Sequence, residues 1–176
     1  WVAKPQRIIE TDKKGKTRDK GWACDLIPKP YIVARYFKKQ QAAIDATQAE
    51  LESVSSQLLE LEEEHGSEEG YLGALEKIAK AEVNARIKEL IGDKESKDEI
   101  AVLKQWLELS ERETELKRSV KSQELKLYQL AHDKYATLSI DEIKSLVIDD
   151  KWMARLTVDV QGELDRVSQT LTGRIR

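Results

Sequence analysis

Apolar side chains recur every seven residues between residues 37 and 65. One series, spaced seven apart, consists of Phe37, Ile44, Leu51, Leu58 and His65. A second series lies three residues after the first and consists of Gln40, Thr47, Val54 and Leu61. Mostly apolar residues at two positions of a heptad form the seam by which one helix packs on another. The pattern predicts a helix over about residues 30–65, with Pro30 in its first turn and Gly66 after its end.

Two further helices are predicted over about 69–91 and 96–136. The third begins with Ser96 and Glu99, which have the spacing of a capping box. At 1.5 Å per residue it would span about 60 Å. It can therefore pair antiparallel with the helix at 30–65, while residues 69–91 close the hairpin. The periodicity leaves open whether the partner helix belongs to this chain or to a neighbour.

The two ends of the chain have different patterns. Residues 7–11 and 21–27 alternate as strands around a polar turn, which predicts a β-hairpin. Because an isolated hairpin is marginal in water, we expect it to pack on a helix or to complete a sheet outside this chain. At the other end, Ser139 and Glu142 form a second capping box. They predict a short helix to about Val147, after which Asp149 or Asp150 would begin a last helix.

The predicted fold is mostly α: a long antiparallel helical hairpin or coiled coil plus shorter helices, with a small N-terminal β-hairpin. We divide it into a basic hairpin (1–29), a long helical arm (30–136) and C-terminal helices (137–176). Charged residues make up 36% of the chain and aromatic residues 6%, a balance that favours long solvated helices over a compact enzyme core.

The charges are distributed unevenly. Residues 1–42 hold eleven Lys or Arg against four acids, whereas residues 43–69 hold nine acids and no Lys or Arg. A basic cluster of this kind can contact phosphates, although a charged, solvated loop has the same composition. The candidate DNA contacts share this basic character and are Lys13, Lys14, Lys16, Arg18, Lys20, Arg35, Lys38 and Lys39.

No motif for catalysis, a cofactor or a metal is found. His65 and His132 lack the spacing of a zinc site, and Cys24 has no histidine nearby in sequence. No phosphate loop or dinucleotide fingerprint is present. We therefore expect no catalytic, cofactor-binding or metal residue in the chain. One cysteine and no long apolar run predict a cytoplasmic protein without a membrane segment.

Four stretches, taken in order, resemble the region after the catalytic domain in modification subunits of type I restriction–modification systems. They are the WACDLIP run at 22–28 with ARYF at 34–37, the AEVNARIKEL run at 81–90, the DEIKSLV run at 141–147 with DDKW at 149–152, and DRVSQ at 165–169 with Leu171 and GRI at 173–175. Together they cover nearly the whole chain.

The resemblance implies a parent subunit that is an adenine-N6 DNA methyltransferase using S-adenosylmethionine. The family's catalytic NPP[FY] and cofactor-binding FxGxG motifs would lie upstream, so no site residue carries over and the segment at hand is not itself an enzyme. The resemblance also implies that these helices bind the specificity subunit. The candidate interface residues are apolar stripe positions, namely Leu51, Val54, Leu58, Leu164, Val167 and Leu171.

Two other functions stay open at this point. The chain can be a coiled-coil structural or adaptor protein unrelated to DNA, or a nucleic-acid-binding helical arm. The basic hairpin argues against a bare coiled coil, and the acidic stretch argues against nucleic-acid contact along the whole arm. A seam without its natural partner often self-associates, so self-association is a further expectation.

Overall fold

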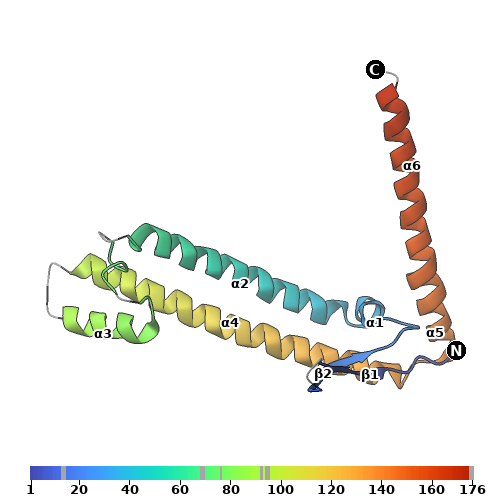
Figure 1. Cartoon of the computed structure of the whole chain (residues 1–176), viewed down its shortest axis with the longest axis horizontal. Coiled ribbons are helices and arrows are strands. Elements are labelled where there is room, and N and C mark those ends of the chain that lie inside the picture. The colour runs from blue at the N-terminus through green and yellow to red at the C-terminus, as the bar shows by residue number, and fades with distance from the viewer. Residues whose placement is uncertain (13–14, 68–69, 76, 92, 94–95, 175–176) are drawn as a thin grey trace. The chain divides into compact units, whose positions relative to one another are not determined.

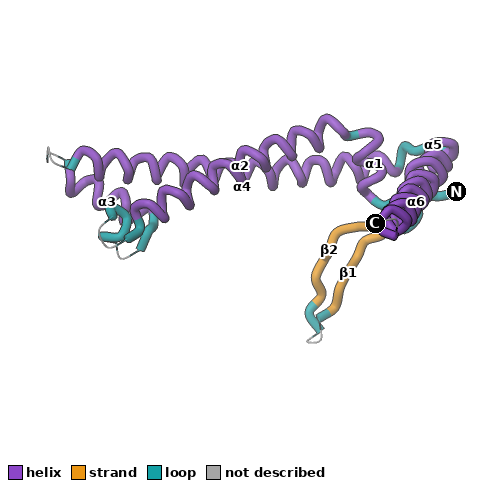
Figure 2. Tube along the Cα trace, turned by 90° about the horizontal axis from the view of Figure 1, so that it is seen from above, coloured by secondary structure: helices purple, strands orange, loops and turns teal. Residues whose placement is uncertain are grey.

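The computed structural model describes the chain except residues 13–14, 68–69, 76, 92, 94–95 and 175–176. Helices dominate, and two short strands pair near the N-terminus (Figures 1 and 2), as predicted. In chain order the elements are β1 (Gln6–Thr11), β2 (Thr17–Ala23), α1 (Lys29–Tyr36), α2 (Lys38–His65), α3 (Lys80–Leu90), α4 (Lys97–Tyr135), α5 (Ile140–Ser145), the π-helix η1 (Leu146–Met153) and α6 (Ala154–Arg174).

The chain forms two compact units. The first contains residues 1–41 and 126–176, and the second contains residues 42–125. Helices α2 and α4 each contribute to both units. Among the described residues, no helix is long and apolar enough to cross a membrane.

The second unit is an antiparallel helical hairpin, as the heptad pattern predicts. Helices α2 and α4 lie side by side in both views (Figures 1 and 2), and residue numbers that rise along α2 meet numbers that fall along α4. Near one end Gln48 meets Glu124, and near the other the indole Nε1 of Trp106 donates to Glu62 at 2.8 Å. The apolar core of the unit contains Leu61, Leu72, Val83, Leu90, Leu103 and Trp106.

Helix α3 is shorter than predicted, because the segment before it is folded into turns. The amide of Leu72 and that of Gly73 both donate to the His65 carbonyl at the end of α2, at 2.9 and 3.0 Å. A Cβ on Gly73 would lie 1.8 Å from the carbonyl oxygen of Ser67, so only glycine fits there. The tight turn buries Leu72 completely in the core and leaves residues 70–75 outside any helix.

The first unit packs the β-hairpin on the end of α4. The antiparallel register pairs Arg7 with Trp22 and Ile9 with Asp19, with an irregularity between them. The Trp22 amide donates to the Tyr128 hydroxyl at 2.7 Å, and the Trp22 indole lies 5.1 Å from the Tyr128 ring. Of the two arrangements expected for the hairpin, the structure therefore has the one in which it packs on a helix.

Two helix boundaries differ from the prediction. The single helix expected over about 30–65 is interrupted at Phe37, where φ is −127° and ψ is 29°. Helix α1 buries Ile32 and Val33 in the first unit, whereas α2 continues into the second. The break expected at Asp149 or Asp150 is absent, because α5 continues through η1 into α6 and the amide of Ala154 donates to the carbonyl of Asp149. The capping box of Ser139 and Glu142 is confirmed.

Candidate interaction surfaces

Helix α6 carries an uncovered apolar stripe. The stripe begins at Met153, the last residue of η1, and continues along α6. Its six side chains share one face at helical spacing and are between 46% and 59% exposed: Met153, Leu156, Val160, Leu164, Val167 and Leu171. All residues from Ala154 to Gly173 are exposed. The predicted stripe member Ile175 lies outside the described residues. Three of the predicted interface residues, Leu164, Val167 and Leu171, are therefore on an accessible surface.

The sequence of α6 is poor for a helix that stands without tertiary support. It contains two glycines, three threonines and three valines among 21 residues. An interior glycine costs about 1 kcal/mol relative to alanine, and most helix stability in proteins comes from packing of an apolar face. The exposed ion pairs Arg155–Asp159 and Arg166–Glu163 contribute only a few tenths of a kcal/mol each. Helix α6 therefore has little stability of its own beyond its helical hydrogen bonds.

The base of the stripe is held firmly to the first unit through η1. The Arg35 guanidinium donates to Ser145 Oγ at 3.0 Å and to Asp150 Oδ1 at 2.9 Å. The Lys151 ammonium donates to the backbone carbonyls of Asp25 and Leu26 at 2.9 and 3.0 Å. These bonds join η1 to α1 and to the segment after β2, so the start of α6 is anchored although its side chains are exposed.

The other three predicted interface residues are placed differently. Val54 is 9% exposed in the second unit, Leu58 packs against its core, and Leu51 is partly buried. These positions belong to the seam that α2 forms within the chain. The prediction of a free docking stripe there is corrected, since a stripe already covered by the chain's own packing is not open to a partner.

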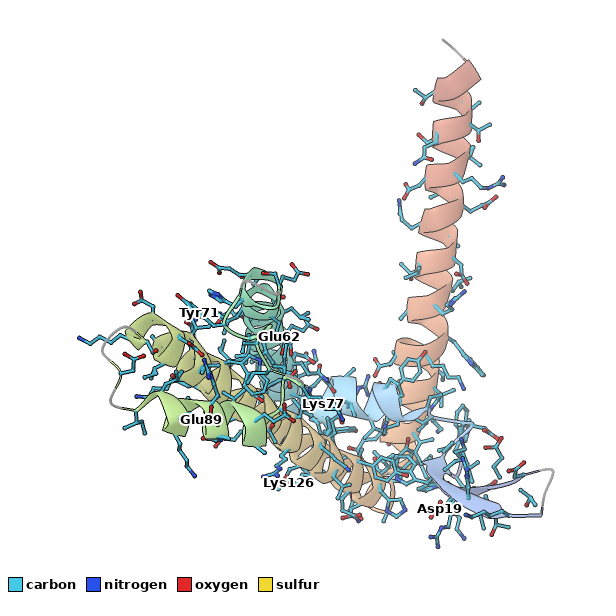
Figure 3. All side chains as sticks on the ribbon, turned by 60° about the vertical axis from the view of Figure 1, so that its left-hand side comes forward. Asp19, Glu62, Tyr71, Lys77, Glu89 and Lys126 are labelled. Atoms are coloured by element: carbon cyan, nitrogen blue, oxygen red, sulfur yellow. The ribbon has the colours of Figure 1, made fainter. Side chains whose placement is uncertain are left out.

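Two of the described hairpin cations are paired with acids of the hairpin itself. Arg7 Nε donates to Asp19 Oδ2 at 3.0 Å, and Lys20 Nζ lies 3.1 Å from Glu10 (Asp19 is labelled in Figure 3). The hydrogen bond from Arg7 is the main cause of the lowered pKa of Asp19. Arg18 lies opposite Glu10 in the strand register. Paired cations of this kind attract phosphate less strongly than unpaired ones.

The remaining predicted DNA contacts divide into three groups. Lys13 and Lys14 lie outside the described residues. Arg35 is corrected to a structural role, because its guanidinium is bound to Ser145 and Asp150 and is only 30% exposed. Lys16, Lys38 and Lys39 are exposed, as is Arg18. The basic surface that is open to a partner is therefore smaller than the sequence suggests.

An aromatic cluster behind the hairpin was not predicted. The Trp22 ring lies 5.1–5.4 Å from the rings of Tyr128, His132 and Tyr135. The Tyr135 hydroxyl donates to the Ile27 carbonyl at 2.6 Å, and burial raises its pKa. An open hollow of about 370 Å³ beside the cluster is lined by residues of the hairpin and α4, including Arg7 and Gln129. The spacing of residues 128, 132 and 135 along one helical face was the signal that could have revealed the cluster.

In the described part of the chain, the side chains that could act as nucleophiles, bases or metal ligands lie apart from one another. Within the part of the chain that the structure describes, no three His, Cys, Asp or Glu residues are grouped as metal ligands. Cys24 is a buried free thiol. His132 lies 3.3 Å from the neighbouring Asp133, and His65 stacks on Tyr71. Nothing in this arrangement joins a nucleophile to a base.

The chain was compared with protein families, curated proteins and solved structures. No protein-family model, curated protein or solved structure matches it.

Proposed function

We propose that the chain is a non-catalytic helical assembly module of a type I restriction–modification DNA adenine methyltransferase subunit. In this proposal it docks on the specificity subunit through α6 and supports DNA binding in the cytoplasm. The observation that carries the docking role is the uncovered apolar stripe of α6, with six side chains about half exposed. The affiliation with the methyltransferase rests on the four stretches of sequence resemblance. S-adenosylmethionine would bind the parent subunit upstream of this chain.

The stripe offers apolar surface for helix-on-helix docking. Burying the exposed half of an aliphatic side chain contributes roughly 1 kcal/mol, so six of them contribute about 6 kcal/mol before the cost of association. A helix laid along the stripe would meet apolar anchors at the centre and polar groups at the rim, which is the usual anatomy of such an interface. The bonds that anchor η1 reduce the ordering needed on binding.

The proposed support of DNA binding rests on exposed lysine and arginine side chains in the first unit. Lys16, Arg18, Lys38 and Lys39 are exposed in the same unit as the hairpin. Four such cations can add phosphate contacts to a larger complex.

Co-purification with a cognate specificity subunit tests the proposal. Val167→Asp places a charge on the stripe and should abolish the complex. Val158→Asp is the matched control, because Val158 is also an exposed valine of α6, at 66% exposure, but lies off the stripe. Loss of the complex with Val167→Asp alone would support docking through α6. If both variants bind as the unchanged chain does, the stripe is not the docking surface.

The same experiment separates the alternatives. A coiled-coil adaptor unrelated to DNA would fail to bind any specificity subunit. A nucleic-acid-binding arm would bind duplex or single-stranded DNA by itself, with strong salt dependence and without regard to Val167. The acidic face of α2, which includes the exposed Glu60, Glu63 and Glu64, makes that second alternative the weaker one.

A further inference from the structure

The apolar stripe of α6 follows an 11-residue repeat. Residues 153–163 read MARLTVDVQGE and residues 164–174 read LDRVSQTLTGR. Apolar residues occupy the first, fourth and eighth positions of both copies, arginine the third, serine or threonine the fifth, and glycine the tenth. The spacing of three, four and four residues gives an average of about 3.67 residues per turn.

The 11-residue period sets the path of the stripe and so the kind of helix that matches it. An 11-residue repeat follows a nearly straight, slightly right-handed path, whereas a heptad repeat follows a left-handed one. The heptad seam between α2 and α4 has the other period, with Ile44, Val54 and Leu61 buried in it. A helix with the same 11-residue repeat follows the same path as α6 along the roughly 27 Å from Met153 to Leu171. Helix α6 of a second copy has that repeat.

The charges of α6 also suit a second copy. Residues 154–174 contain three arginines and three acids. Arg155 is bound to Asp159 and Arg166 to Glu163 within the helix. Two such helices do not repel each other. The same balance disfavours an anionic membrane surface, because interfacial helices that bind such membranes carry an excess of Lys or Arg on the polar face.

We propose that two copies of this chain pair through their α6 stripes, each helix covering the apolar face of the other. The inference rests on the proposed use of α6 as a docking helix: in the chain by itself a second α6 covers the stripe, and the specificity subunit competes for the same stripe. Pairing removes six half-exposed apolar side chains per copy from water. It also supplies the packing that a helix rich in Gly, Thr and Val lacks on its own.

Sedimentation equilibrium of the 176-residue chain over a wide dilution series tests the pairing. We expect a reversible monomer–dimer equilibrium. Val167→Asp should weaken the dimer by about a hundredfold or more, because the new carboxylate would be buried without a partner. Val158→Asp should leave the dimer unchanged. Since residues 154–173 are all exposed, far-ultraviolet circular dichroism should show that the other helices persist in both variants.

Disulfide cross-linking gives a second readout. Val160 is near the middle of the stripe, so two copies of it approach each other in either parallel or antiparallel pairing. In a Cys24→Ala background, Val160→Cys should form a cross-linked dimer under mild oxidation and Val158→Cys should not. A chain that stays monomeric at all concentrations would overturn the inference, as would a dimer that Val167→Asp leaves intact.

The two proposals can fail separately. A monomeric chain that still binds the specificity subunit would overturn the α6 pair and leave the proposed function standing. A dimer sensitive to Val167→Asp that binds no specificity subunit would overturn the proposed function and leave the α6 pair standing.

Discussion

Replacement of Gly21 by alanine tests how the β-hairpin is held on α4. Gly21 has φ of +89°, a region that glycine enters freely and other residues rarely adopt. A Cβ at this position would lie 2.2 Å from the Tyr128 hydroxyl oxygen. That oxygen accepts the Trp22 amide at 2.7 Å, so it cannot move away without loss of a hydrogen bond. Gly21→Ala should therefore detach β2 from α4 rather than only strain a turn.

The expected loss of stability has two parts. The left-handed backbone costs alanine about 1–2 kcal/mol. Displacement of Tyr128 adds about 1 kcal/mol for the hydrogen bond and about 1 kcal/mol for its ring contact with Trp22. Gly21→Ala should therefore destabilise the first unit by about 3–4 kcal/mol. Gly15→Ala is the matched control: its φ is +77°, but nothing lies within 4 Å of an added Cβ, so only the backbone part of about 1–2 kcal/mol remains.

Hydrogen exchange of residues 17–23, combined with urea unfolding, measures both variants. Combining Gly21→Ala with Tyr128→Phe measures the interaction between the two positions, because Tyr128→Phe removes the oxygen atom that the new methyl group would contact. Gly21→Ala should cost about 1 kcal/mol less in the Tyr128→Phe background than in the unchanged chain, as in a double-mutant cycle. The reasoning is refuted if Gly21→Ala costs no more than Gly15→Ala, or if its cost is the same in both backgrounds.

Three other predictions concern the packing of each unit. Trp106→Ala should destabilise the second unit by about 3–5 kcal/mol, since the indole is 4% exposed in its core; a fall of less than 1 kcal/mol in urea unfolding would contradict that placement. Arg35→Met should cost about 1–2 kcal/mol, because Asp150 loses its partner in a half-buried pair, and added protection of residues 146–153 from hydrogen exchange would contradict the anchoring role. The pKa of Glu142 is lowered to about 2 from an ordinary 4.5, chiefly by the backbone hydrogen bond from Ser139. Its stabilising effect is therefore present above about pH 4.5 and lost as pH falls toward 2, and Glu142→Gln should flatten that part of the curve of melting temperature against pH.

Features encoded by neighbouring residues could be predicted from the sequence. The heptad spacing predicts that the α2 region is a helix that packs on another helix, and the alternation around the polar turn predicts the hairpin. The capping box of Ser139 and Glu142 depends on a spacing of three residues and is found as expected. In each case the interacting groups are close in sequence or share one simple period.

Features that depend on distant residues could not be predicted. The η1 segment is bonded to Arg35 and to the carbonyls of Asp25 and Leu26, more than 100 residues earlier in the chain. The burial of Val54 within the chain could not be predicted for a related reason. A heptad seam predicts that a helix needs a partner but does not say which helix fills that place, and here α4 of the same chain does.

In the proposed docking, the anchored η1 and the uncovered α6 act together. Helix formation is limited by its first turn, which fixes several residues for one hydrogen bond, while each later residue adds a bond at little net gain. The bonds of Arg35 and Lys151 hold the helix ahead of α6 and so provide that first turn. The glycines, threonines and valines of α6 keep the free energies of its helical and unwound states close to each other. Burial of the apolar stripe against a partner would then favour the full helix. Protection of α6 amides from hydrogen exchange should therefore decline from residue 154 toward 174 in the monomer and become uniform in the paired state. Uniform strong protection in the monomer would show that α6 needs no partner to form.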